Sequence, residues 1–364
     1  MYLHKLKLNN FKNIPEADLT FCPNVNCLVG LNGVGKTNIL DSIHYLSFCK
    51  SYFSVIDSNN IKHDEEFFSI HGFYNYQDDI EEKYSCSLKK GNRKQFKNRD
   101  KEYNKLSEHI GKIPLVMITP SDQELIVGSG EIRRKFIDLV ISQADIVYLD
   151  SLIQYNKALE QRNKLLKYFS ESKSFDSISL SLWDEQLIHF GKEINRKRKE
   201  FIENFSEPFQ DYYTLITSGK EIVSLDYLTK DYENDFENIL LGNRERDRIL
   251  NYTSSGVHKD DLGLMLNGYN VRKYASQGQQ KSFLLALKLA QFEYLFNRKG
   301  IKPILLLDDV FDKLDLERIE QLIYLVGSDR FGQVFLSDTQ IGRVESIFKK
   351  IDIEHKIFCY DKSW

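Results

Sequence analysis

Eight consecutive residues near the N-terminus have the types and spacing needed to hold the phosphates of a nucleotide. Residues 30–37 match the pattern G-x-x-x-x-G-K-[ST] at every fixed position. The glycines let the backbone wrap closely around a phosphate and point its N–H groups at it. Lys36 adds a positive charge, and the hydroxyl of Thr37 is a ligand for Mg²⁺. We therefore expect the nucleotide to be bound by Gly30, Leu31, Asn32, Gly33, Val34, Gly35, Lys36, Thr37 and Asn38.

Two adjacent carboxylates follow a short apolar run in the C-terminal part of the chain. Residues 304–307 are typical of a strand buried on both faces, and ligands of open α/β sheets bind at the carboxyl ends of such strands. Asp308 is placed to hold Mg²⁺, and Asp309 is placed to polarise the attacking water. Asp309 and Lys36 are therefore the catalytic candidates. Solvated acids in a strand-end turn are the alternative.

A second anion-binding segment opens a helix upstream of the two acids. Residues 275–282 resemble the signature of ABC-type ATPases, whose usual form is L-S-G-G-Q. In that class one subunit holds ATP on its glycine loop, and the signature of the other subunit caps the γ-phosphate. The resemblance implies an ATP-dependent homodimer, with Asp315 as a further interface residue and with ATP contacted in trans by Ser276, Gly278 and Gln279. An ordinary serine N-cap is the alternative reading of Ser276.

The elements that must position these residues follow from hydrophobic periodicity. Short strands precede the glycine loop and the acids, and a helix is expected over 37–48. From about residue 131 the pattern becomes helical, and one long helix is expected to end before Pro208. We predict an α/β protein: an ABC-type ATPase head with a phosphate-binding loop, formed by residues 1–130 and 251–364, and a helical insertion lobe over 131–250.

Composition limits the function classes. The chain has 364 residues, too many for one compact core, and its net charge of −3 means that any contact with DNA must come from local patches. The five cysteines form no disulfide or zinc pattern. The N-terminus lacks the apolar segment of a signal peptide, and no apolar run is long enough to span a membrane. A cytoplasmic protein without a membrane partner is expected.

The densest basic run covers residues 89–101 and is typical of a hairpin. Its cations could neutralise DNA phosphates, and Phe96 within it could stack on a base. A solvated hairpin is the alternative. A second run, 196–199, lies on a helix, where four consecutive side chains point to all sides, so that a solvated helix is favoured. The DNA-contact candidates are Lys89, Lys90, Arg93, Lys94, Lys97 and Arg99.

Further motifs, in the same order along nearly the whole chain, resemble those of the RecF family. The segments concerned are 35–43, 118–122, 133–138, 161–167, 183–187, 256–262, 275–281 and 307–310. The resemblance implies an ATP- and Mg²⁺-dependent protein of recombinational gap repair, replication and the SOS response. It also implies binding to single-stranded or gapped DNA, weak DNA-stimulated ATP hydrolysis, and the partners RecO and RecR.

Some positions depart from the family pattern. Val257 stands where proline is usual, and Ser337-Asp338-Thr339-Gln340 stands near the usual T-T-T-D. Asp338 and Thr339 are weak candidates for the residue that senses the γ-phosphate, and Gln123 is a weak candidate for the glutamine loop. The alternative function is the nucleotide-binding subunit of another ABC-type machine, either a transporter or an SMC-like protein. The short distance from the glycine loop to the signature, without long heptads, disfavours the SMC-like alternative.

Overall fold

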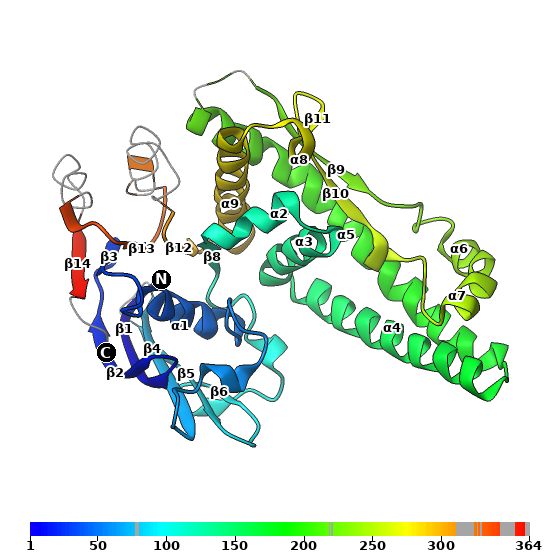
Figure 1. Ribbon diagram of the computed structural model, residues 1–364, viewed down its shortest axis with the longest axis horizontal. Coiled ribbons are helices and arrows are strands. Elements are labelled where there is room, and N and C mark those ends of the chain that lie inside the picture. The colour runs from blue at the N-terminus through cyan, green and yellow to red at the C-terminus, as the bar shows by residue number, and fades with distance from the viewer. Residues whose placement is uncertain are drawn as a thin grey trace. The chain divides into compact units, whose positions relative to one another are not determined.

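The computed structural model divides the chain into two compact units (Figure 1). It describes residues 1–76, 80–217, 219, 221–310, 324–325, 327, 330–342 and 354–360. The first unit combines Met1–Asp122 with Lys288–Trp364, and the second is Gln123–Leu287. The second unit therefore interrupts the first in sequence. It also includes residues 251–287, which the sequence pattern predicts to be part of the ATPase lobe, so that the signature segment belongs to the second unit.

A parallel sheet of five strands positions the glycine loop and the two acids in the first unit. Its order is β14-β3-β13-β12-β8, so strands that are neighbours in space come from distant parts of the chain. Helix α1 (Lys36–Phe48) follows β3, and nearly all of its residues are buried. The strands are β3 (Val25–Gly30), β8 (Leu115–Ile118), β12 (Ile304–Leu307), β13 (Val334–Asp338) and β14 (His355–Tyr360).

An antiparallel sheet of six strands completes the described part of the first unit, in the order β2-β1-β4-β5-β6-β7. Buried and half-exposed residues alternate along β4 and β5, as expected for a sheet with one face on the core and the other facing water. The strands are β1 (Tyr2–Phe11), β2 (Ile14–Thr20), β4 (Phe67–Asn75), β5 (Glu81–Lys89), β6 (Gln95–Asn98) and β7 (Lys101–Glu102). Short 3₁₀ helices lie at Asp57–Asn60, Leu106–Glu108 and Pro120–Gln123.

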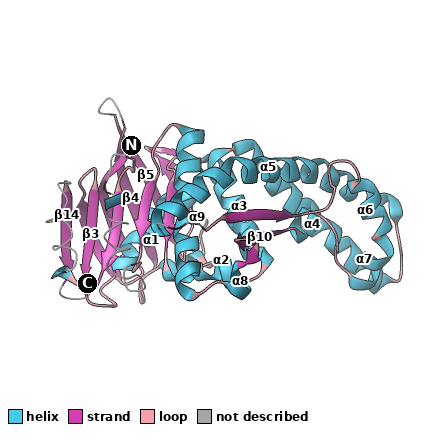
Figure 2. Cartoon of the chain, turned by 90° about the horizontal axis from the view of Figure 1, so that it is seen from above, coloured by secondary structure: helices cyan, strands magenta, loops and turns pink. Residues whose placement is uncertain are grey.

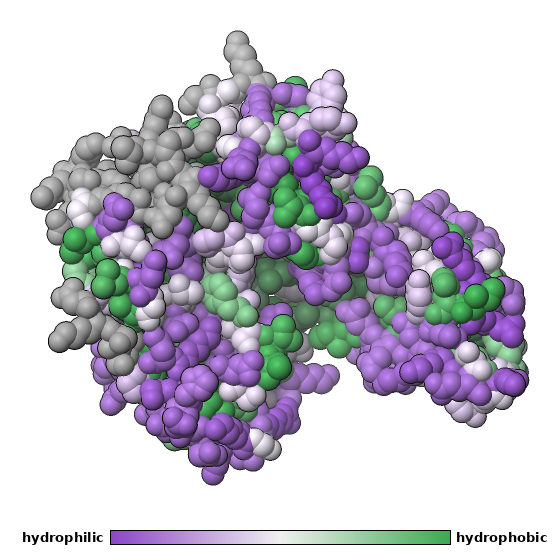
Figure 3. Space-filling view, viewed as in Figure 1, coloured by the Kyte–Doolittle hydropathy of each residue, from purple (hydrophilic) through white to green (hydrophobic). Residues whose placement is uncertain are grey.

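Helices dominate the second unit (Figure 2). Buried residues recur every three or four positions along α4 (Ile146–Ser172), and the surface of this helix in view is mainly hydrophilic (Figure 3). The other helices are α2 (Glu124–Val127), α3 (Gly130–Ala144), α5 (Ser177–Thr217), α6 (Phe236–Gly242), α7 (Arg244–Leu250) and α8 (Val271–Tyr274), with a 3₁₀ turn at Val257–Lys259. Helix α9 (Gln277–Lys299) begins in this unit and ends in the first.

Two expectations for the insertion were wrong. Helix α5 does not end before Pro208 but continues through it, because buried side chains on both sides of the proline, such as Phe205 and Phe209, hold the helix against its neighbours. The insertion is also not purely helical, because its strand β9 joins β10 and β11, which follow residue 250, in a small antiparallel sheet of the second unit in the order β11-β10-β9. Its strands are β9 (Val223–Leu228), β10 (Asp261–Leu266) and β11 (Tyr269–Asn270).

A buried arginine joins three helices of the second unit. Arg162 on α4 is fully buried, and its Nε donates to Asp184 on α5 at 2.6 Å. Its Nη1 donates to Asp247 on α7 at 2.7 Å and to the Thr253 hydroxyl at 2.9 Å. Asp184 also accepts from Arg244 at 2.8 Å, so that two carboxylates pair with two guanidinium groups, which is the condition for keeping such charges out of water. No helix within the described ranges is long and apolar enough to cross a membrane.

Candidate nucleotide site

The glycine loop connects the carboxyl end of β3 to the first turn of α1. Gly33 and Gly35 have φ angles of +84° and +101°, a region that residues with a Cβ rarely adopt. At Gly30 a Cβ would lie 2.3 Å from the carbonyl oxygen of Tyr360 on the neighbouring strand. The backbone conformation and the close packing therefore require glycine at these positions. Helix α1 begins directly after the loop, so that its positive N-terminal end lies at the loop.

The side chain of Lys36 folds back onto the loop. Its ammonium group donates to the carbonyl oxygens of Gly30 at 2.7 Å and Leu31 at 2.9 Å, and the residue is 5% exposed. The charge is thus held close to the loop by two neutral acceptors. An anionic phosphate is a stronger partner for this ammonium than a carbonyl oxygen, because both groups of the new hydrogen bond are charged.

Thr37 and Asp308 meet at the mouth of the loop. The Thr37 hydroxyl donates to Asp308 Oδ1 at 3.0 Å, and Asp308 is 4% exposed. Burial raises the pKa of the Asp308 carboxyl above its usual value, although hydrogen bonds from Ser337 and Thr37 oppose that rise. A hydroxyl and a buried carboxylate side by side are hard oxygen ligands, so the donor set fits Mg²⁺.

Ser337 joins the two acids, and sequence reasoning did not single it out. Its hydroxyl donates to Asp308 Oδ1 at 2.8 Å and accepts from the backbone N–H of Asp309 at 2.9 Å. Leu307 of β12 pairs with Leu336 of β13, so the next residue on each side, Asp308 and Ser337, lie side by side. The available signal was a hydroxyl directly after an apolar strand, but the pairing of the two strands is not visible in the sequence.

Asp309 adopts an unusual backbone conformation. Its φ is +47°, in the left-handed region that few residues other than glycine, asparagine and aspartate enter. Such conformations concentrate at functional sites, where the surrounding structure compensates for them.

Asp338, one of the two weak candidates for the sensing residue, is 1% exposed and accepts from the backbone N–H of Gln340 at 2.9 Å. Thr339, the other candidate, is half-buried.

The signature segment forms a reciprocal cap at the start of α9. The Ser276 hydroxyl accepts from the Gln279 backbone N–H at 3.2 Å, and the Gln279 side-chain oxygen accepts from the Ser276 N–H at 2.8 Å. The alternative reading as a serine cap therefore describes this geometry correctly. It does not exclude a ligand, because Ser276 is exposed and its hydroxyl hydrogen is not used by the cap. Gly278 lies within the first turn of the helix.

Gln123 contacts the signature helix. Its Nε2 donates to the side-chain oxygen of Gln280 at 2.8 Å. The preceding residue, Asp122, forms an ion pair of 2.6 Å with Lys288, eight positions further along the same helix. Gln123 thus lies next to the signature segment of its own unit. The expected interface residue Asp315 lies outside the described residues.

The basic hairpin divides into exposed and buried members. Lys89, Lys90, Arg93 and Arg99 are exposed, and Lys97 is half-buried on β6. Lys94 differs from them, because its side chain is 11% exposed and its ammonium group lies 2.7 Å from Asp57 Oδ2 and 2.6 Å from the carbonyl oxygen of Cys49. Phe96 is 1% exposed and packs against His109, so it cannot stack on a base in this structure. Strand alternation along β6 turns Phe96 inward, whereas Lys94 lies just before this strand and is held by its contacts with Asp57 and Cys49.

Two of the family-like segments pair with each other in the second unit. Nε and Nη2 of Arg133 each donate to one oxygen of the Asp261 carboxylate at 2.8 Å, and Arg134 donates to the carbonyl oxygen of Asp260. Arg198, from the second basic run, is buried and lies 2.9 Å from Asp138. These contacts give the segments at 133–138 and 256–262 a structural role, and Arg198 is a core cation and not part of a solvated face.

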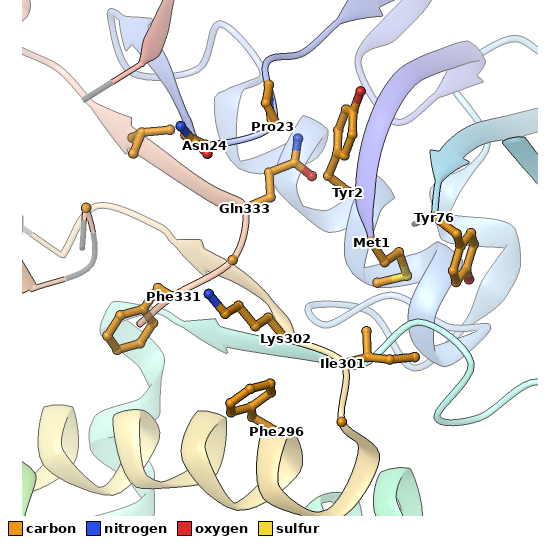
Figure 4. A pocket seen from close by; sticks show the side chains of 14 residues that line it. Met1, Tyr2, Pro23, Asn24, Tyr76, Phe296, Ile301, Lys302, Phe331 and Gln333 are labelled. Carbon is orange, nitrogen blue, oxygen red and sulfur yellow. The ribbon is translucent and has the colours of Figure 1, made fainter. Parts of the chain in front are cut away.

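A cavity of about 640 Å³ lies at the opposite ends of the parallel strands (Figure 4). Its lining includes Asn24 just before β3, Lys302 near the start of β12 and Gln333 just before β13. Ligands of open α/β sheets bind at the carboxyl ends of the strands. We therefore place the nucleotide at the glycine loop and not in this cavity.

Comparison with known proteins agrees with this geometry. The family model described as RecF/RecN/SMC N terminal domain matches residues 2–356. The DNA replication and repair protein RecF of Flavobacterium johnsoniae is 51% identical over 98% of this chain and 99% of its own length, and that of Phocaeicola vulgatus is 48% identical over 99% and 97%. A solved structure of the recombination mediator protein RecF-ATP in the RecFOR pathway matches with a TM-score of 0.87 at 31% identity, covering 100% of this chain and 98% of that one.

Proposed function

This chain belongs to the RecF family of DNA replication and repair proteins, and we propose that it is the ATP-dependent DNA clamp of recombinational gap repair in its cell. It binds ATP, dimerises on it, and holds single-stranded or gapped DNA in the cytoplasm until slow hydrolysis, stimulated by DNA, releases it. The match at about half identity over almost the whole chain supports this function over a transporter subunit or an SMC-like machine.

The observation that carries the ATPase part of the proposal is the contact between Thr37 and Asp308 at 3.0 Å. It places Thr37, at the end of the glycine loop, against Asp308, so that the hydroxyl and the carboxylate could together hold Mg²⁺. Mg²⁺ would supply charge neutralisation for the phosphates. Lys36 would hold the β- and γ-phosphates after leaving its carbonyl partners, and Asp309 would orient the attacking water.

The exposed signature segment supports the dimer. The cap leaves the Ser276 hydroxyl hydrogen available, and the first turn of α9 presents backbone N–H groups and a positive dipole end to solvent. A γ-phosphate held on the glycine loop of a second copy is the anion that we propose for this surface. ATP would then be a shared ligand of two subunits, and the dimer would be lost when the γ-phosphate is removed.

The exposed cations of the hairpin are the proposed contacts with DNA, and Lys94 is withdrawn from that set because of its burial. Lys89, Lys90, Arg93 and Arg99 would neutralise backbone phosphates, which predicts affinity that falls with salt. RecO and RecR are the proposed protein partners. The structure of a relative in the RecFOR pathway supports this assignment.

The proposal is tested by fluorescence anisotropy of a labelled gapped duplex titrated with protein, with and without Mg²⁺-ATP. We expect ATP to strengthen DNA binding by the natural chain and to leave DNA binding by the variant Lys36→Met unchanged. Equal DNA binding with and without ATP would contradict the proposal of a nucleotide-gated clamp. Absence of DNA binding at moderate salt would contradict direct DNA binding but not the proposed ATPase activity.

A further inference from the structure

A chain of hydrogen bonds leads from the signature segment to a glutamate that no sequence motif marks. It begins at the reciprocal cap, in which the Gln279 side-chain oxygen accepts from the Ser276 backbone N–H at 2.8 Å. The carboxamide of Gln279 therefore controls where the backbone of Ser276 lies. The other end of that carboxamide, Nε2, donates to Glu221 Oε1 at 2.6 Å. Glu221 thus holds the residue that holds Ser276.

The carboxylate of Glu221 is itself oriented from the other side. The hydroxyl of Tyr213 on α5 donates to Glu221 Oε2 at 2.8 Å, and Tyr213 is fully buried. Each oxygen of the carboxylate consequently has its own donor, and a rotation of the group would break both hydrogen bonds together. Both hydrogen bonds are charge-assisted, which makes them stronger than bonds between neutral groups.

The backbone around Glu221 is also held in place. Gln210 of α5 donates from Nε2 to the carbonyl oxygen of Glu221 at 3.1 Å and accepts at Oε1 from the N–H of Val223 at 2.8 Å. The N–H of Ile222 donates to Asn267 Oδ1 at 2.8 Å. The start of β9 is therefore tied to both α5 and the β10–β11 turn, so that the position of Glu221 is set by the frame of the second unit.

The charge of Glu221 fits a positioning role more closely than direct contact with a nucleotide. A carboxylate near the first turn of α9 interacts favourably with the positive end of the helix dipole. The same charge would repel a γ-phosphate in direct contact. Because Gln279 stands between Glu221 and Ser276 in the hydrogen-bond chain, Glu221 can fix the signature without being its phosphate ligand.

We propose that Glu221 is a positioning residue for the ATP-dependent dimer: through Gln279 it holds the signature segment in the shape that receives the γ-phosphate of the partner subunit. The inference rests on the dimer of the proposed function. It predicts that dimerisation depends on Glu221 whereas binding of ATP to the monomer does not, because the glycine loop belongs to the other compact unit.

The test compares Glu221→Ala with Glu221→Gln in the full-length protein. The alanine variant loses both acceptors. The glutamine variant keeps an acceptor for Gln279 and can place its amide group against the Tyr213 hydroxyl, which accepts as well as donates. Analytical ultracentrifugation across an Mg²⁺-ATP titration measures the ATP concentration for half-maximal dimer. Binding of a fluorescent ATP analogue, measured at protein concentrations below dimerisation, reports the glycine loop alone.

We expect Glu221→Ala to raise the ATP concentration for half-maximal dimer by about tenfold, equivalent to about 1.4 kcal/mol. Glu221→Gln should stay within about twofold of the natural chain, as should Glu203→Ala, which removes an exposed glutamate from α5. Binding of the analogue to the monomer should be equal in all four proteins. A thermal melt shows whether each variant retains its fold.

Each other outcome overturns a different statement. If the natural chain does not dimerise with ATP, the proposed dimer is wrong and Glu221 has no interface to position. If the natural chain dimerises and Glu221→Ala does so equally well, the positioning role is wrong although the dimer stands. An equal loss in the alanine and glutamine variants would show that the negative charge matters and not the hydrogen-bond chain, which also overturns the inference.

Discussion

The hydroxyl oxygen of Thr37 lies 3.0 Å from Asp308 Oδ1, although 271 positions separate the two residues in the chain. Strand β13 lies between β3 and β12 in the parallel sheet, so the contact spans the width of a strand and depends on the loop that leaves β3. Two oxygens that meet in this way act on a cation as one site. The consequences for nucleotide binding can be measured.

Removal of the Asp308 charge should abolish the effect of Mg²⁺ on nucleotide affinity. We expect Asp308→Asn to bind a fluorescent ATP analogue equally with Mg²⁺ and with EDTA. The natural chain should bind the analogue at least about tenfold more tightly with Mg²⁺, because Thr37 and Asp308 would hold the ion and the ion would neutralise phosphate charge. Thr37→Ser keeps the hydroxyl and serves as the control for Thr37→Val, which loses it. An undiminished response to Mg²⁺ in Asp308→Asn would contradict the assignment of the site.

Ser337 should matter for hydrolysis. Ser337→Ala removes the acceptor of the Asp309 N–H and a donor to Asp308, and hydrogen bonds to charged groups contribute about 1.5–3 kcal/mol. We expect phosphate release at saturating Mg²⁺-ATP to fall by about tenfold or more. Ser337→Thr retains the hydroxyl at the end of a strand and should keep most of the rate. A rate unchanged in the alanine variant would reduce Ser337 to a packing residue.

Lys94 and Arg93 are adjacent in the hairpin but should respond oppositely to substitution. Lys94→Met breaks the contacts with Asp57 and the Cys49 carbonyl, and we expect a loss of about 1–3 kcal/mol of unfolding free energy with little change in DNA affinity. Arg93→Met removes an exposed cation and should weaken DNA binding, whereas its unfolding free energy should stay within about 0.5 kcal/mol of that of the natural chain. Urea unfolding and anisotropy with the gapped duplex measure both effects. Weaker DNA binding of Lys94→Met at unchanged stability would restore Lys94 as a contact.

Stability should fall as the pH drops from about 6.5 to 4. Burial lowers the pKa of His44, His109 and His258 to about 4, compared with about 6.5 in the unfolded chain. The unfolded state therefore binds more protons within this window, and each histidine contributes stability that is complete above pH 6.5 and lost towards pH 4. The loss is about 2 kcal/mol per histidine at pH 5.

Substitution of one histidine isolates this effect. The buried carboxyl of Asp260, whose pKa burial raises to about 6, acts in the opposite direction, because its contribution is lost as the pH rises through 6. We therefore compare the natural chain with His109→Gln, which keeps a donor for the Leu46 carbonyl. The difference in unfolding free energy between pH 7 and pH 5 should be smaller in the variant. An identical difference would show that His109 is not neutral in the folded protein.

The strands and the helix that flank the glycine loop and the two acids are predictable from the sequence, because they depend on local backbone. A loop that wraps a phosphate needs glycines at set intervals, and a buried strand that ends in carboxylates is visible as an apolar run. Ser337 and Glu221 have no such local requirement. Ser337 meets the acids only because β12 pairs with β13, and Glu221 reaches Gln279 from a segment 58 positions away.

The basic hairpin shows a different limit of sequence reasoning. Residues 89–101 form a dense run of cations, yet the period of two along a strand sends neighbouring side chains to opposite faces. On β6, Phe96 is therefore part of the core while Lys97 is half-buried. Just before the strand, Arg93 is exposed, and the Lys94 side chain is covered because it contacts Asp57 and the Cys49 carbonyl. The expected end of a helix at Pro208 failed for a related reason, since buried side chains around the proline outweighed its local preference.

The guanidinium of Arg162 also constrains how the second unit can be cut. Its partners Asp184 and Asp247 follow 22 and 85 positions later, and Asp184 also accepts from Arg244. A fragment that stops before residue 247 would therefore leave two guanidinium groups on one carboxylate. Such a fragment is expected to remain open to proteolysis instead of forming a smaller stable piece.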